Sequence, residues 1–80
     1  MKSDRIIINQ YDTVVEFTVN RIDNKFDGKE VFWHSMTIEV CPRCDTEMVA
    51  TIKFNTIDAS ELEEMAQELL KLAARMKVEK

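Results

Sequence analysis

Glycine and proline are almost absent from this sequence, which has one of each among its 80 residues. A phosphate-cradling loop needs several glycines close together, so that class of nucleotide site is excluded. A flexible linker, normally rich in glycine, serine or proline, is excluded for the same reason. We therefore expect a single domain over residues 1–80, with Gly28 and Pro42 placed at turns.

Residues for catalysis are also scarce. His34 is the only histidine, and the sequence shows neither a Ser-His-Asp arrangement nor a pair of carboxylates suited to acid–base work. His34 shares a strand face with Phe32 and Met36, which favours a partly buried histidine at the edge of the core. We therefore do not expect an enzyme.

Long apolar runs are missing. No stretch approaches the ~20 apolar residues that a membrane-spanning helix requires. The apolar run that Asn9 ends is too short for a signal peptide. The sequence thus predicts an intracellular, cytoplasmic protein without a membrane span. In that compartment Cys41 and Cys44 are more typical of thiols or metal ligands than of a structural disulfide, although all three states stay open.

The charge and length restrict the partners. The formal net charge is −4, which disfavours a protein whose main role is to grip nucleic acid, because phosphates call for a basic surface. A chain of 80 residues buries only about 60% of its unfolded surface, so its core is marginal. A metal, a disulfide or a second copy would add stability, and we expect a homodimer.

Alternating apolar residues predict an antiparallel sheet over residues 5–55. Residues 14–22 and 31–40 alternate as strands, and Asp27-Gly28 between them is a strong hairpin signal. With Phe26 facing Lys29, the apolar faces of the two strands coincide, which a shift of one residue would destroy. The short run Arg5–Gln10 is a candidate further strand.

A third alternating segment, residues 48–55, follows the two cysteines. A turn centred on Pro42-Arg43-Cys44 would place Met36 opposite Ala50 and Phe32 opposite Phe54. The predicted fold is therefore α+β: an antiparallel β-meander of three to four strands, with one C-terminal amphipathic helix over residues 58–77 packed on one face of the sheet.

The predicted helix has a clear start and an asymmetric charge distribution. Asp58 and Glu61 are spaced as a capping box, and Ile57 and Leu62 as a hydrophobic staple. Its bases (Lys71, Arg75, Lys77, Lys80) follow its acids. The simpler interpretation of the acids is that they complement the helix dipole; the alternative is an acidic docking surface. This acidic patch comprises Asp58, Glu61, Glu63, Glu64 and Glu68.

The motif Cys41-Pro42-Arg43-Cys44, a CPxC turn between two strands, resembles one knuckle of a zinc ribbon. That resemblance implies that both sulfurs point at one ion. It covers about a dozen residues and departs from the pattern, because Asp45 replaces the usual glycine and no second ligand pair follows. His34 lies about 23 Å back along its strand at ~3.3 Å per residue, and Asp45 and Glu47 are poor ligands for such a site. Cys41 and Cys44 are thus a half-site, which one zinc per two chains would complete across a dimer; the alternative is a surface turn without metal.

The second face of the sheet is the predicted partner surface. An exposed tryptophan in an apolar patch often marks an interface, and one helix cannot cover both faces. The alternative is that the N-terminal strand or the chain ends cover this face. The predicted partner-binding residues are Trp33, Val31, Ile22 and Val49.

These patterns lead to three functional hypotheses. The first is a small acidic, non-enzymatic protein-interaction module, an inhibitor or regulator of a larger protein, acting as a homodimer through the Trp33 face or the cysteine turn. The second is a zinc-knuckle module that binds nucleic acid through Arg21, Lys25, Lys29, Arg43 and Lys53. The third is a thiol oxidoreductase, which is disfavoured because strands, rather than a helix N-terminus, flank the cysteines.

Overall fold

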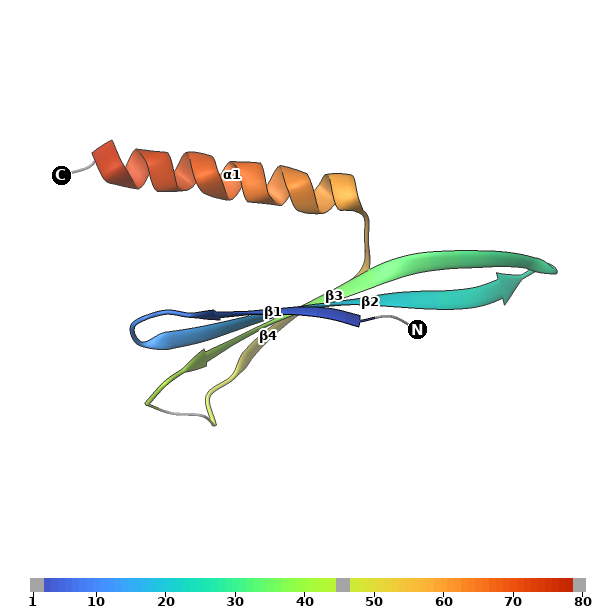
Figure 1. Cartoon of the computed structure of the whole chain (residues 1–80), viewed down its shortest axis with the longest axis horizontal. Helices are drawn as coiled ribbons and strands as arrows, with labels where there is room; N and C mark the ends of the chain where they lie inside the picture. The colour runs from blue at the N-terminus through green and yellow to red at the C-terminus, as the bar shows by residue number, and fades with distance from the viewer. Residues whose placement is uncertain (1–2, 45–46, 79–80) are drawn as a thin grey trace.

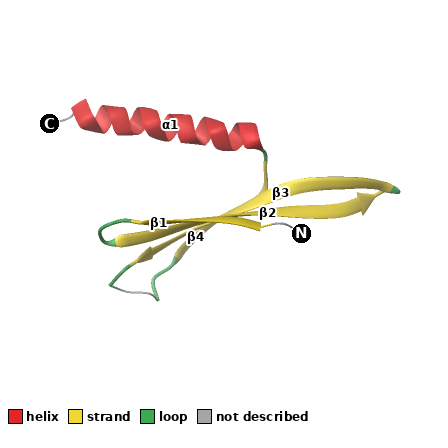
Figure 2. Ribbon diagram, viewed as in Figure 1, coloured by secondary structure: helices red, strands yellow, loops and turns green. Residues whose placement is uncertain are grey.

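The fold is a four-stranded antiparallel meander followed by one helix, as seen in a computed structural model that describes residues 3–44 and 47–78 (Figures 1 and 2). The strand order is β1-β2-β3-β4. The predicted α+β class is confirmed, and the N-terminal segment forms the additional strand. The elements are β1 (Ser3–Asn9), β2 (Thr13–Phe26), β3 (Lys29–Pro42), β4 (Ala50–Ile57) and α1 (Ala59–Val78).

The β2–β3 hairpin forms in the predicted register. Phe26 pairs with Lys29, and further along Val19 pairs with Met36. Asp27 and Gly28 at the tip both have positive φ, of 58° and 77°, as a two-residue type I′ turn requires. The right-handed twist of the strands favours this turn, so the local sequence alone sets the pairing of the two longest strands.

The predicted register between β3 and β4 is wrong by four residues. Met36 pairs with Phe54 rather than with Ala50, and Ala50 pairs with Val40. The cause is the connection, because β3 continues through Pro42 and β4 begins only at Ala50. A shift of four residues is even, so it leaves every side chain on the face that alternation predicts.

A β-bulge interrupts the β3–β4 pairing near the end of β4. Met36 pairs with Phe54, but His34 pairs with Ile57, so β4 contains one extra residue between these pairs. The extra residue turns Ile57 to the same face as Phe54. As a result Ile57 is buried there, with 7% of its surface exposed.

The predicted capping box is present at the start of α1. The backbone N–H of Glu61 donates to Oδ1 of Asp58 at 2.8 Å, and the backbone N–H of Asp58 donates to Oε1 of Glu61 at 3.1 Å. The Ser60 hydroxyl donates to the same Asp58 oxygen at 2.7 Å. The bonds from Asp58 and Glu61 satisfy backbone donors that have no partner within the helix.

The helix lies over one face of the sheet (Figure 1). An open groove of about 620 Å³ separates α1 from the end of β4, lined by Phe54, Ile57, Met65 and Leu72 among others. No residue of α1 within its described range is buried. This helix is also not apolar enough to cross a membrane, and no other helix occurs in the described parts of the chain.

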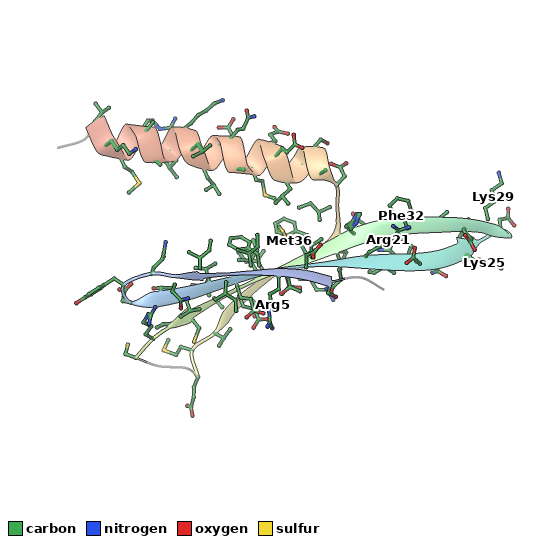
Figure 3. All side chains as sticks on the ribbon, in the orientation of Figure 1. Arg5, Arg21, Lys25, Lys29, Phe32 and Met36 are labelled. Atoms are coloured by element: carbon green, nitrogen blue, oxygen red, sulfur yellow. The ribbon has the colours of Figure 1, made fainter. Side chains whose placement is uncertain are left out.

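The single chain is therefore unusually open. Its Cα radius of gyration is 16.2 Å, whereas a compact domain of this length has a radius of about 12 Å. Among the described residues the buried apolar side chains are Met36, 1% exposed, and Ile57. Met36 lies at the middle of the sheet on the groove face, beside Phe54 (Figure 3).

Candidate functional site

The outer part of the β2–β3 hairpin projects beyond the rest of the sheet. Among residues 3–44 and 47–78, β1 pairs with β2 as far as Asn20, and β4 pairs with β3 as far as His34. Within this part of the chain, residues 21–33 form a two-stranded ribbon that no described strand flanks, drawn at the right of Figure 1. A two-stranded hairpin is only marginally stable in water, so a partner that covers this ribbon would stabilise it.

The two faces of the ribbon differ in chemistry. On one face Ile22 of β2 pairs directly with Trp33 of β3, and Val31 lies two residues before Trp33 on β3. Trp33 and Ile22 are half-buried and Val31 is exposed. Phe26, 75% exposed at the ribbon tip, belongs to the same face by alternation. From the sequence alone, Phe26 was considered only as part of the turn. The two-residue alternation that places Ile22 on this face also places Phe26 there.

The opposite face of the ribbon carries polar groups around one aromatic ring. The Arg21 guanidinium lies 4.0 Å from the ring centroid of Phe32, and its Nε donates to Asp23 at 3.1 Å. His34 meets the Phe32 ring edge-on at a centroid distance of 5.9 Å. Arg21, Lys25, Lys29 and Phe32 are labelled along the ribbon in Figure 3. The half-buried state of His34 agrees with its predicted place at the core edge.

Val49 lies far from Trp33 along the sheet. Because the β3–β4 register differs from the predicted one, Val49 lies just before β4, next to the Val40–Ala50 pair. Trp33 lies seven residues from Val40 on β3, or about 23 Å at 3.3 Å per residue. Val49 thus keeps its predicted face but lies away from Ile22, Val31 and Trp33, and partner binding by these residues stays a prediction.

The two cysteines occupy different structural settings. Cys41 is a residue of β3, paired with Val14 on β2, and it is half-buried. Cys44 lies in the turn that follows and is exposed. The predicted turn centred on Pro42-Arg43-Cys44 is therefore wrong at its first half, because Pro42 is still paired as strand.

Arg43 between the cysteines connects two loops. Its Nε donates to the carbonyl of Gln10 at 2.9 Å, and its backbone N–H donates to the carbonyl of Asp12 at 2.9 Å. Its Nη2 also donates to Oδ1 of Asn9 at 3.3 Å. The side chain thus fastens the β1–β2 turn to the end of β3, which is a structural role that the sequence did not suggest.

The bridging zinc stays a prediction. In residues 3–44 and 47–78 no group of three or more His, Cys, Asp and Glu side chains is arranged to hold a metal ion. Asp45, considered as a further ligand, lies outside the described residues. A site built on Cys41 and Cys44 would need ligands from a second chain, since four ligands are usual for structural zinc.

The five basic residues of the nucleic-acid hypothesis do not form one edge. Lys25 and Lys29 lie at the ribbon tip, and Arg43 follows the far end of β3. The length of β3 separates these two groups by roughly 45 Å at 3.3 Å per residue. A phosphate-binding face needs clustered bases, so this arrangement gives that hypothesis no support.

The acidic patch divides between two sides of α1. Glu61, Glu64 and Glu68 line the groove toward β4, whereas Glu63 points to the other side of the helix. Glu68 also pairs with Lys71 at 3.2 Å. The acids therefore do not form one continuous docking surface, and Asp58 serves the helix start.

Lowering the pH is expected to destabilise the first turn of α1. The hydrogen bond from the Ser60 hydroxyl, followed by that from the Glu61 backbone, lowers the pKa of Asp58 below its ordinary 3.8. A lowered folded-state pKa stabilises the fold above the ordinary value, and this contribution is lost as pH falls through the folded pKa. Amide hydrogen exchange at Ser60 and Glu61, normalised for its intrinsic pH dependence, should therefore accelerate below about pH 4.

The matched control is Asp58→Asn, which keeps a good capping side chain but removes its titration. Its normalised exchange should change less with pH than that of the wild type. An equal pH response in both proteins would show that Asp58 is not the responsible group.

The chain matches no protein-family model, and neither a curated protein nor a solved structure is significantly similar to it.

Proposed function

We propose that this chain is a small non-enzymatic protein-interaction module that acts as a homodimer and binds a further protein through its ribbon. The observation that supports this most directly is the ribbon of residues 21–33, which no strand of the described residues flanks and which carries Ile22, Val31 and Trp33 on one face. A regulator or inhibitor of a larger protein fits this design, as does a cytoplasmic location.

The chemistry of the ribbon favours a protein partner. Its apolar face offers one large aromatic anchor, Trp33, beside two aliphatic side chains, and tryptophan is enriched at the energetic centres of protein interfaces. Arg21, Asp23 and Lys25 lie on the other face, where Arg21 stacks on Phe32. A binding partner with an apolar cleft would cover the first face and leave the second in water.

The test compares Trp33→Ala with Phe32→Ala, which removes the neighbouring aromatic ring from the opposite face. Tagged protein is incubated with extract of the source organism, and the retained proteins are quantified by mass spectrometry. Loss of a central tryptophan typically costs 2 kcal/mol or more, or about 30-fold in affinity. We expect Trp33→Ala to lose a retained protein that wild type and Phe32→Ala both keep.

Equal retention by all three proteins would contradict the proposed ribbon surface. Light scattering tests the homodimer separately. A wild-type mass near one chain, 9.4 kDa, at high concentration would contradict that part of the proposal.

A further inference from the structure

α1 carries apolar side chains beyond those that line the groove. From α1 the groove takes Met65, Leu69 and Leu72, together with Glu61, Glu64, Glu68 and Arg75. Five further apolar residues lie, with Leu69 at the groove edge, within an arc of roughly 120° at the helical period of 100° per residue. We name this arc the outer stripe; it comprises Leu62, Ala66, Leu69, Leu70, Ala73 and Met76, all of them exposed.

The outer stripe is continuous with the apolar groove. Leu69 lines the groove and also borders the stripe, with 63% of its surface exposed. Leu70 is 69% exposed. The small side chains of Ala66 and Ala73 leave room near the middle of the stripe for a second helix to approach within the usual 8–10 Å.

The exposed area of the chain matches what a second copy would cover. The chain exposes 7,090 Å², whereas a compact monomer of this mass exposes about 5,000 Å². The excess is therefore roughly 2,000 Å² per chain. Obligate homodimers bury about 2,000–5,000 Å² in total, so an interface that removed half of this excess from each chain would already fall in that range.

The charges along α1 are complementary to those of a reversed copy. Glu63, Leu70 and Lys77 follow one another at seven-residue steps along one edge of the stripe. An antiparallel copy related by a two-fold axis near Leu70 would place each Glu63 opposite the second copy's Lys77. A parallel copy would instead oppose like charges.

We propose that α1 pairs with α1 of a second copy, antiparallel, through the outer stripe. The proposal rests on the homodimer of the proposed function and specifies its interface. A two-fold arrangement of this kind is isologous, so both copies use the same surface. In an antiparallel pair the two helix dipoles also point in opposite directions, which is the favourable arrangement. The ribbons are separate elements and stay available for another protein.

The first test compares Ala73→Glu with Ala74→Glu, using sedimentation equilibrium on the full chain. Both alanines are exposed and adjacent, but Ala73 lies at the centre of the stripe and Ala74 about 100° away from it. A glutamate at position 73 would bury one unpaired charge from each copy. We expect Ala73→Glu to raise the dimer dissociation constant about 100-fold or more, and Ala74→Glu to leave it within about 3-fold.

The second test distinguishes antiparallel from parallel pairing of the two helices. It does not require the monomer to be stable. Glu63→Lys and Lys77→Glu should each weaken the dimer, about 2- to 30-fold for two exposed pairs. The double variant Glu63→Lys/Lys77→Glu should restore wild-type affinity. Failure of the double variant to restore affinity would overturn the antiparallel arrangement.

The remaining outcomes separate this proposal from the proposed function. A wild-type dimer that Ala73→Glu weakens no more than Ala74→Glu would overturn the α1 interface and leave the homodimer standing. A wild-type chain that stays monomeric would overturn both. Circular dichroism of each variant, at concentrations where it remains folded, shows that a changed mass reflects association rather than unfolding.

Discussion

Replacing Met36 by alanine is expected to lower the free energy of unfolding by about 2–5 kcal/mol. Met36 is 1% exposed and lies where β2, β3 and β4 meet, paired with Val19 on one side and Phe54 on the other. A chain of this length has a total stability of only about 4–12 kcal/mol. The substitution therefore removes a large share of it, and urea denaturation at fixed protein concentration measures the loss.

The matched control is Met48→Ala, because Met48 is 66% exposed and precedes β4. The same atoms are deleted, but little apolar surface returns to water, so the loss should stay within about 0.5 kcal/mol. A similar loss at both positions would mean that the stabilising core does not centre on Met36.

Replacing Ile57 by alanine should have the second largest effect, a loss of about 2–4 kcal/mol. Ile57 is 7% exposed and is the last residue of β4, one position before the cap of α1. Its burial depends on the bulge that turns it toward the groove face. The substitution should also change the orientation of α1, which small-angle scattering would detect as an altered radius of gyration.

Ile52→Ala controls for residue type, strand and face. Ile52 pairs with Ile38 on the groove face but is 54% exposed, so its truncation should cost less than about 1 kcal/mol. If Ile52→Ala destabilised the chain more than Ile57→Ala, the packing at the end of β4 would not be what anchors the helix.

The features predicted correctly are those that short stretches of sequence determine. The Asp27-Gly28 turn sets the β2–β3 register, because only a few residues tolerate the positive φ that both positions adopt. The capping box of Asp58 and Glu61 depends on a spacing of three residues. In each case the interacting groups are close in sequence, so local geometry leaves few alternatives.

The β3–β4 pairing shows why the remaining features were missed. Alternation determines which face a side chain occupies, but it does not distinguish registers that differ by an even number of residues. The loop before Ala50 and the bulge before Ile57 set the pairing instead. Val49 was assigned to the partner surface by its face alone, and the register places it away from Trp33.

Sequence patterns were sufficient to predict the class of fold, the long hairpin, the start of the helix and the shared face of Ile22, Val31 and Trp33. The three-dimensional arrangement was needed to show that no strand in residues 3–44 and 47–78 flanks the outer hairpin, and that α1 keeps an apolar stripe in solvent. Periodicity states which side of an element is apolar. The lengths of the neighbouring strands and the packing of the helix determine whether anything covers that side.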